Sequence, residues 1–293
     1  MVADLAMERP APAGMTLAGA LAGVAERLGV AGIAEPRREA LRIWAGLAGA
    51  APARALADAA ATQLDAAQAA AFLAAAVRRA RGEPLAYVTG RAGFRHLELA
   101  ADRRALIPRP ETEGLVELVL ERAQRGDVAD IGTGTGCIAL SLATEGRFHR
   151  VVAVDRSAAA LALACENAAA LGADLALVQG DLTRALAAGS LDALVSNPPY
   201  LSTAEYAALD GAVRDWEPAL ALESGPDGLA ATEALLDDGR RVLRPRGWIA
   251  LELDASRAAE TARRASALGW ADVAIHHDLF GRERYLLARR NDA

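Results

Sequence analysis

Four consecutive residues, Asn197-Pro198-Pro199-Tyr200, are suited to holding a planar amino group. Pro198 and Pro199 have no backbone N–H, so the segment offers carbonyl oxygens and resists helix formation. The side-chain oxygen of Asn197 and the main-chain oxygen of Pro198 can together accept both hydrogens of one NH2 group. Tyr200 can stack on a flat amide or base. The segment therefore predicts a catalytic and substrate-binding site that turns the face of an NH2 group toward a methyl donor.

Such a site would overcome the low reactivity of an amide nitrogen, whose lone pair is delocalised. Two hydrogen-bond acceptors would favour the partial positive charge that develops on nitrogen as a bond to carbon forms. Alignment in line with a sulfonium methyl would supply the rest through proximity and orientation. No strong general base is needed, because the methylated product loses its extra proton easily. A glutamine amide and an adenine base both fit this geometry, and the residues alone do not choose between them.

A second motif, Asp130-Ile131-Gly132-Thr133-Gly134-Thr135-Gly136, follows a predicted strand and precedes a predicted helix. Glycines there allow a sharp turn and a close approach by a ligand, and the amides of a helix N-terminus suit an anionic group. The spacing is G-x-G-x-G, unlike the G-x-G-x-x-G of dinucleotide-binding proteins. An amino-acid-bearing nucleoside fits this motif better than a pyrophosphate, with Asp130 near a ligand ammonium. A simple strand-to-helix turn is the alternative.

Acidic residues follow the next two predicted strands. Asp155 is placed to accept hydrogen bonds from both hydroxyls of a ribose, although it could instead cap the helix that follows. Asp181 is placed to meet an adenine amino group, and Leu182 to line the face of the base. An ordinary turn acid is the alternative for Asp181. We therefore predict a cofactor site formed by Asp130, Gly132 to Gly136, Asp155, Asp181, Leu182 and Asn197.

The elements that must position these residues alternate between strands and helices after Glu111. Helices are predicted at 157–171 and 232–242. This alternation is typical of an α/β fold, a Rossmann-like parallel sheet with crossover helices. The last two strands are separated by a short loop and could close the sheet as an antiparallel hairpin. The predicted strands are 128–131, 151–154, 173–178, 191–195, 248–253, 271–276 and 284–288.

In the first part of the chain, apolar residues recur at helical spacing. Residues 1–82 predict a small all-α domain, with helices near 17–28, 37–47 and 65–81 and Asp65 as a helix N-cap. Residues 83–106 predict a β-hairpin linker, with Tyr87 and Val88 in a strand and a turn at 90–93. Residues 107–293 form the predicted catalytic domain. Arg78 and Arg79 either lie on a solvated face or help the first domain to bind an acidic partner.

Composition narrows the classes of protein to consider. The chain of 293 residues is 53% hydrophobic and carries a net charge of -6, so it has no overall attraction for nucleic acid or an anionic membrane. Its two cysteines give neither a disulfide framework nor metal-ligand spacing, and they suit a reducing cytoplasm. Asp4, Glu8 and Arg9 interrupt the N-terminal region, so we expect no signal peptide, and no apolar run is long enough to span a membrane.

These motifs resemble the amino-methyltransferase branch of the S-adenosylmethionine-dependent superfamily, which carries an (N/D)PP(Y/F) motif. The likeness is closer to the HemK-type peptide chain release factor glutamine methyltransferases, and it extends from about residue 83 to the C-terminus. One departure lies at the end of strand 248–253. There Asp254 replaces the glycine usual in the family, and Arg257 stands near the position where a glutamine is expected. This departure bears on the geometry of the local loop and not on the chemistry of the Asn197 to Tyr200 segment. The segments that carry the likeness are 83–90, 106–113, 216–222, 227–229 and 278–284, with Asn167 and Gly172.

The resemblance implies a seven-stranded methyltransferase sheet behind a small helical domain. It implies S-adenosylmethionine as cofactor, with S-adenosylhomocysteine as product, and contact with it by Gly132 to Gly136, Asp155 and Leu182. The implied substrate is the glutamine of the Gly-Gly-Gln loop of class 1 release factors, held by Asn197 to Tyr200 in support of translation termination. Glu111 either lines this site or is simply an acid at a helix start. We expect a monomer without direct nucleic-acid binding.

Other functions remain to be weighed. A ribosomal-protein glutamine methyltransferase would use the same chemistry. A DNA adenine-N6 methyltransferase would flip its base out of the duplex, but it normally needs a basic DNA-reading surface that this acidic chain lacks. An idle cofactor-binding protein would not need the intact Asn197-Pro198-Pro199-Tyr200 segment, and a nicotinamide oxidoreductase would have a different glycine spacing.

Overall fold

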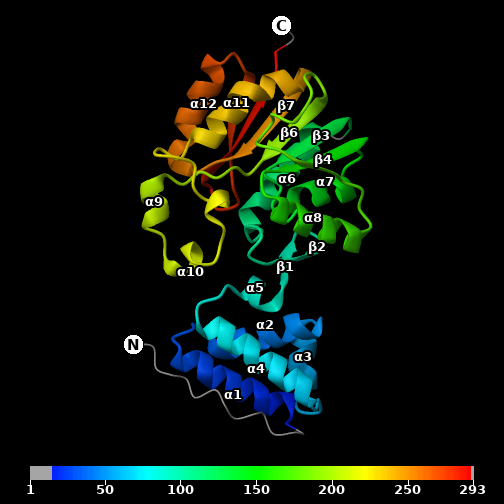
Figure 1. The fold of residues 1–293 in the computed structure, drawn as a ribbon, viewed down its shortest axis with the longest axis vertical. Helices are drawn as coiled ribbons and strands as arrows, with labels where there is room; N and C mark the ends of the chain where they lie inside the picture. The colour runs from blue at the N-terminus through cyan, green and yellow to red at the C-terminus, as the bar shows by residue number, and fades with distance from the viewer. Residues whose placement is uncertain (1–14, 124, 292–293) are drawn as a thin grey trace. The chain divides into compact units, whose positions relative to one another are not determined.

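The computed structural model describes residues 15–123 and 125–291 (Figure 1). Contacts divide the chain into two compact units, with the boundary between Arg91 and Ala92. The N-terminal charges from which we expect no signal peptide lie outside the described residues. Within the described residues, no helix is both long and apolar enough to cross a membrane.

The first unit is a bundle of helices around an apolar core. The fully buried side chains of Leu28, Ile43 and Phe72 form its centre, and Trp44 meets Phe72 edge to face, with ring centroids 5.5 Å apart. The three predicted helices are confirmed, whereas α3 was not predicted. The helices are α1 (Leu17–Val30), α2 (Pro36–Ala48), α3 (Pro52–Asp58), α4 (Ala66–Ala80) and α5 (Leu85–Thr89).

Polar contacts fix the ends of these helices. Asp65 is the N-cap of α4, and it forms a capping box in which its side chain accepts from the Gln68 amide at 2.8 Å. At the other end of α4, the Arg78 guanidinium binds the Glu83 carboxylate. Arg79 pairs with Glu39 at 2.6 Å. Both arginines therefore form ion pairs within their own unit and are not simply part of a solvated face.

The segment around residue 90 differs from the prediction. Tyr87 and Val88 lie in helix α5 and not in a strand, because Pro84 begins a helical turn and both side chains are buried. Gly90, with φ of 72°, is the C-cap of this helix. The hairpin that follows consists of β1 (Arg91–Phe94) and β2 (Leu97–Ala100), so its turn lies five residues beyond Gly90, at Arg95.

The second unit contains a seven-stranded sheet with the order β5-β4-β3-β6-β7-β9-β8. Strands β3 to β7 are parallel, and β9 runs antiparallel to both β7 and β8. The predicted closing hairpin is thus confirmed, with β9 inserted between β7 and β8. The strands are β3 (Asp127–Ile131), β4 (Arg150–Asp155), β5 (Ala176–Gln179), β6 (Leu191–Ser196), β7 (Leu243–Glu252), β8 (Ala271–His277) and β9 (Glu283–Arg289).

Helices cover both faces of this sheet (Figure 1). On one face pack α6 (Pro110–Arg122), α7 (Cys137–Glu145) and α8 (Ala158–Leu171), and on the other pack α11 (Ala230–Val242) and α12 (Ala258–Ala267). This burial on both faces explains why the parallel strands read as short apolar runs. Two short helices, α9 (Thr203–Ala207) and α10 (Gly211–Arg214), and two 3-10 turns, η1 (Ala219–Ala221) and η2 (Ala255–Arg257), lie in the connections.

The strand order places a topological switch point between β3 and β6. From β3 the chain proceeds through β4 to β5 on one side, and β6 then returns to pair with β3 on the other side. Ligands of open α/β sheets bind beyond the carboxyl ends of the strands at such a point. The glycine motif leaves β3 there, and Asn197 leaves β6.

The capping box of α4 gives a first test. Asp65→Ala removes the acceptor for the Gln68 amide, so the free energy of opening of α4 should fall by about 1 kcal/mol. Hydrogen exchange of the α4 amides measures this change. Asp58→Ala is the matched control, because the Asp58 carboxylate forms an exposed ion pair with Arg54 and its loss should change that free energy by less than about 0.5 kcal/mol. Equal effects of the two variants would contradict the capping role.

Candidate functional site

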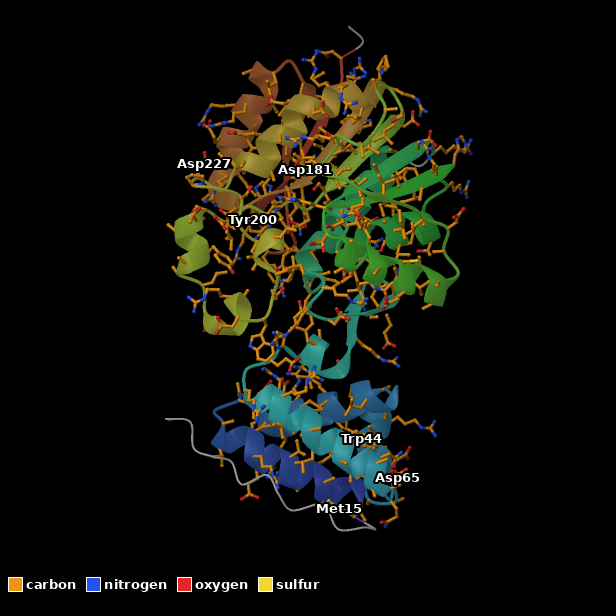
Figure 2. All side chains as sticks on the ribbon, in the orientation of Figure 1. Met15, Trp44, Asp65, Asp181, Tyr200 and Asp227 are labelled. Atoms are coloured by element: carbon orange, nitrogen blue, oxygen red, sulfur yellow. The ribbon has the colours of Figure 1, made fainter. Side chains whose placement is uncertain are left out.

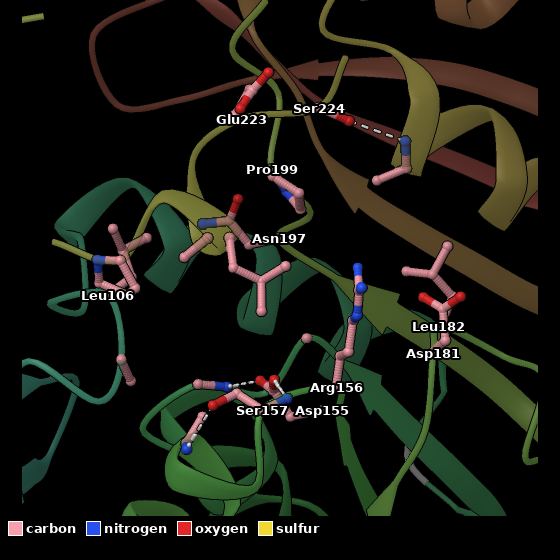
Figure 3. Close-up of a pocket in the computed structure, with 18 of the residues that line it drawn as sticks. Leu106, Asp155, Arg156, Ser157, Asp181, Leu182, Asn197, Pro199, Glu223 and Ser224 are labelled. Carbon is pink, nitrogen blue, oxygen red and sulfur yellow. Dashed lines mark hydrogen bonds between the residues drawn. The ribbon is translucent and has the colours of Figure 1, made fainter. Parts of the chain in front are cut away.

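A pocket of about 420 Å³ lies beyond the carboxyl ends of the parallel strands (Figure 3). Its volume is in the range of small-molecule and cofactor sites. Four successive strand ends contribute to its wall: Gly132 and Gly134 after β3, the segment 155–157 at the end of β4, the segment 180–182 after β5, and Asn197 and Pro199 after β6. The structure thus brings together residues from the glycine motif, from the two acidic strand ends and from the Asn197 to Tyr200 segment.

The glycine motif forms a tight loop against β4. The amides of Gly132 and Thr133 both donate to the Val154 carbonyl, at 2.8 and 3.0 Å. Gly132 and Gly134 have φ values of 75° and 56°, a conformation that side-chain-bearing residues rarely adopt. Gly132 and Gly134 also line the pocket, so their lack of a side chain allows a ligand to lie against the backbone.

The remaining members of the motif support the loop from behind and do not line the pocket. Asp130 is completely buried. Its Oδ2 accepts from the Thr133 hydroxyl at 2.6 Å and from the Ala139 amide at 3.1 Å. Burial raises the pKa of Asp130 to about 7 despite these two hydrogen bonds. The structure gives Asp130 Oδ2 contacts that fix the loop, while its Oδ1 is buried without a hydrogen-bond partner among the described residues, and its contact with a ligand stays a prediction. Thr135 and Gly136 also lie outside the pocket lining.

Asp155 lies at the end of β4 and faces the pocket (Figure 3). Its Oδ2 accepts from the Gly134 amide at 2.9 Å, and its Oδ1 accepts from the Ser157 amide at 2.8 Å. Ser157, not Asp155, is the N-cap of α8. A carboxylate has about four lone-pair positions, so Asp155 keeps acceptor capacity on the pocket side.

Asp181 and Leu182 follow β5 and also line the pocket. Asp181 forms an exposed ion pair with Arg184 at 2.7 Å. Leu182 has φ of 52°, an unfavourable conformation for a bulky side chain, and strain of this kind is concentrated at functional sites. Leu182 packs in part against the core of the sheet, so the strained backbone places an apolar side chain at the pocket wall.

The segment after β6 is anchored by its neighbours. The buried Ser196 hydroxyl donates to the Ile131 carbonyl at 2.6 Å, which joins β6 to the start of the glycine loop. The Asn197 side-chain Nδ2 donates to the Thr112 hydroxyl at 3.0 Å. Asn197 and Pro199 line the pocket, whereas Pro198 is buried and the half-buried Tyr200 is not one of the lining residues. Burial raises the pKa of the Tyr200 hydroxyl, which keeps that hydroxyl protonated.

Further pocket residues were not recognised from the sequence as site residues. Arg156 follows Asp155, and the segments 104–106, 218–225 and 230–231 contribute the opposite wall. Two contacts join residues that flank the first of these segments to residues just before the second: Arg109 pairs with the buried Glu217 at 2.5 Å, and the Arg103 guanidinium lies 4.0 Å from the centre of the Trp216 ring. Segments 106–113 and 216–222 both carry the family resemblance, which was the available signal.

Three residues whose roles the sequence left open have definite positions. Glu111 is an acid in the first turn of α6 and lies outside the pocket lining. Asp254 accepts from the Ser256 amide at 2.9 Å as the N-cap of η2. Arg257 donates to the Asp227 carbonyl at 2.8 Å and pairs with Glu205 at 2.5 Å. Arg257 therefore holds the segment at Asp227, and the neighbouring Gly228 lies against the Tyr200 carbonyl; Figure 2 labels Asp227 and Tyr200.

The pocket can hold a nucleoside but offers little for a metal. Its wall combines apolar surface, glycine backbone and the Asp155 carboxylate, a combination that suits an aromatic base attached to a ribose. In residues 15–123 and 125–291, no cluster of His, Cys, Asp and Glu has the composition of a metal site.

Gly228 provides a test of how the loop after β6 is positioned. Its φ is 76°, and a Cβ there would overlap the Tyr200 carbonyl oxygen and lie 2.9 Å from the Ser202 nitrogen. Gly228→Ala should displace Tyr200 and lower the free energy of unfolding by roughly 1 to 3 kcal/mol. Chemical denaturation measures the loss. Gly23→Ala is the control, because nothing lies within 4 Å of a Cβ at Gly23; an unchanged Gly228→Ala protein would show that the loop tolerates the shift.

Comparison with known proteins identifies the family of the chain. The model of the methyltransferase small domain matches residues 111–214, and that of the PrmC N-terminal domain matches residues 19–90. A solved methyltransferase from Pyrococcus furiosus is similar in fold, with 20% sequence identity, a TM-score of 0.51, and coverage of 67% of this chain and 89% of that one. The match supports the methyltransferase sheet at the level of fold.

Curated relatives give the more specific result. The release factor glutamine methyltransferase of Moorella thermoacetica is 42% identical over 284 residues, which cover 95% of this chain and all of that protein. The protein of the same name from Nitratidesulfovibrio vulgaris is 44% identical over 221 residues, which cover 73% of this chain and 75% of that protein. Identity at this level extends through both units, and the chain belongs to the release factor glutamine methyltransferase family.

Proposed function

We propose that this protein transfers a methyl group from S-adenosylmethionine to the side-chain amide nitrogen of the glutamine in the Gly-Gly-Gln loop of class 1 release factors. One observation carries the proposal: Asn197 and Pro199 open into the same pocket as the strand-end residues suited to a nucleoside, Asp155 among them (Figure 3). The names of the relatives support the choice of release factors as substrate.

The cofactor half of the proposal uses the residues that line the pocket. Asp155 would accept hydrogen bonds from the ribose hydroxyls, because it ends β4 beside the glycine loop and keeps free lone pairs. Gly132 and Gly134 would lie against the amino-acid part of the cofactor. Asp181 and Leu182 would meet the adenine edge and face. Asp130, Thr133, Thr135 and Gly136 would act by holding the loop in shape.

The acceptor half uses Asn197 to Tyr200. The Asn197 Oδ1 and the Pro198 carbonyl oxygen would accept hydrogen bonds from the two N–H groups of the glutamine amide, and Tyr200 would cover its flat face. Bound S-adenosylmethionine supplies an electrophilic methyl group on a sulfonium. The two fixed acceptors would stabilise the positive charge that develops on the glutamine nitrogen as it takes the methyl group and the cofactor leaves as S-adenosylhomocysteine. The nitrogen then loses one proton to solvent, which leaves the methylated amide.

The wider setting follows from the substrate. We propose that the helical unit, residues 1–82 in our division of the chain, helps to recognise the release factor, and that the protein acts as a monomer in the cytoplasm without binding nucleic acid itself. Residues 83–106 would link that unit to the catalytic residues 107–293. A ribosomal protein as substrate would require the same amide chemistry, so the assay below includes it as a competitor.

A transfer assay tests the substrate. The protein is incubated with labelled S-adenosylmethionine and a class 1 release factor, either intact or with the Gly-Gly-Gln glutamine replaced by alanine. We expect label on the intact factor alone. Label on the alanine version would refute the proposed target, and label on ribosomal proteins or double-stranded DNA would favour one of the rival substrates.

Asn197→Ala tests the acceptor site. We expect turnover to fall by at least about 10² to 10³, as when one preorganised group at a transition state is removed, while the affinity for S-adenosylmethionine stays within about threefold. Calorimetric titration and initial rates measure the two effects. Asn291→Ala is the control, since Asn291 is exposed and distant in sequence from the motif. Loss of cofactor affinity without a larger loss of turnover would reverse the assignment of the two halves.

A further inference from the structure

Two buried polar residues stand behind Asn197 and do not line the pocket. Thr112 lies in the first turn of α6 and is 2% exposed, and Glu252 ends β7 and is 1% exposed. The Thr112 hydroxyl accepts from the Asn197 Nδ2 at 3.0 Å and donates to the Glu252 carboxylate. Asn197, Thr112 and Glu252 therefore form a connected series of hydrogen bonds that runs from the pocket wall into the core.

The chemistry of this series sets the orientation of the Asn197 amide. A hydroxyl has one hydrogen to donate, and an ionised carboxylate can only accept. Once Thr112 gives its hydrogen to Glu252, it can offer Asn197 only a lone pair. Asn197 must then present its NH2 group to Thr112, so its Oδ1 is the end of the amide turned away from Thr112. With the amide reversed, two acceptors would face each other and the oxygen would be lost to the substrate.

We propose that Thr112 and Glu252 are positioning residues, which hold the Asn197 amide so that its oxygen is available to the NH2 group of the substrate. This inference rests on the proposed function and deepens it. Neither residue touches the reacting atoms. Both act by fixing in advance a dipole that stabilises charge in the transition state, so no reorganisation is needed during the reaction.

The environment of Glu252 makes this arrangement sensitive to pH. Burial is the largest influence and raises the pKa of Glu252 to about 7, against the hydrogen bond from Thr112 and the charge of Arg284. Its Oε2 is buried without a hydrogen-bond partner among the described residues. The groups that face Glu252 are Arg109 and Glu111 at the start of α6, Cys137 at the start of α7, Tyr200 after β6, and Arg284 and Tyr285 on β9.

The sign of the pH effect follows from the hydrogen bonds. Above about pH 7, Glu252 is ionised and takes the Thr112 hydrogen, which fixes the amide. Below about pH 7, Glu252 is protonated and the Thr112 hydroxyl is free to donate to Asn197, which removes the preference for one orientation. We therefore expect turnover to rise with pH through about 7.

Substitutions at Thr112 separate positioning from packing. Thr112→Val keeps the shape but removes the hydroxyl, so kcat should fall by about 10-fold to 100-fold, less than for loss of a contacting group, with cofactor affinity within threefold. Thr112→Ser retains the hydroxyl and should restore kcat to within about threefold of the original protein. A Thr112→Val protein with unchanged kcat would overturn the proposal, as would a Thr112→Ser protein that is no better than Thr112→Val.

Glu252→Gln tests the titration directly. The introduced amide oxygen can still accept the Thr112 hydrogen but does not ionise near neutrality, so turnover at pH 8 should be largely kept and its decline toward pH 6 should disappear. Persistence of the same decline in Glu252→Gln would show that another group titrates and would overturn the proposed pH effect. This readout does not depend on how well the Thr112 variants fold.

A measurement without substrate distinguishes failure of this inference from failure of the proposed function. The Asn197 side-chain NH2 resonances, identified by their absence in Asn197→Ala, should shift between pH 6 and 8 in the original protein but not in Glu252→Gln or Thr112→Val. Resonances that are independent of pH in the original protein would refute the positioning role. If release factors are not methylated but these shifts occur, the proposed function fails and the orientation of Asn197 stands.

Discussion

The parallel pairing of β3 with both β4 and β6 determines where the site residues lie. Ile131 is in register with Val154, and Asp130 is in register with Val195. The loops that leave these strands therefore emerge at one edge of the sheet. Helices bury both faces of the strands, and a slip of one residue would exchange the side chains between two fully packed layers. The packed core thus fixes the points at which the loops leave the strands.

Within that edge, buried polar contacts determine the shape of the loops. Asp130 holds the glycine loop through Thr133 and Ala139, and Ser196 ties β6 to Ile131. Such contacts are directional, whereas apolar packing is not. Burial disfavours the charged form of a carboxyl group, and it raises the pKa values of Asp130 and Glu252 to about 7. The site therefore depends on two carboxyl groups whose charged state is disfavoured by burial. Their hydrogen bonds set the orientation of neighbouring groups, which apolar packing alone could not do.

The sequence predicted the features that have a local signal. Strand runs, the glycine motif, Asp155 and Asn197 could be read from periodicity and spacing, and the structure places the last three at one pocket. The segment at Tyr87 and Val88 was misread because five residues between Pro84 and Gly90 suit a short helix as well as a strand. Contacts such as Arg109 with Glu217, which are 108 residues apart, leave no local pattern. Thr112 and Glu252 escaped recognition for the same reason, since their importance arises only from their meeting with Asn197.

Arg257, which departs from the family pattern, contacts the loop that follows Tyr200. Gly228 packs against the Tyr200 backbone, and Arg257 binds the adjacent Asp227 carbonyl. Arg257 also reaches Glu205, whose carboxylate accepts from the Ser202 amide at 2.8 Å. Because a guanidinium carries five N–H donors in a rigid plane, one side chain joins both ends of the loop that follows Tyr200. The glycine loop and Asp155 lie on the far side of β6 from these contacts, along the sheet order. Arg257 therefore supports the loop whose segment 218–225 forms part of the pocket wall, while the glycine loop and Asp155 are joined by a hydrogen bond of their own.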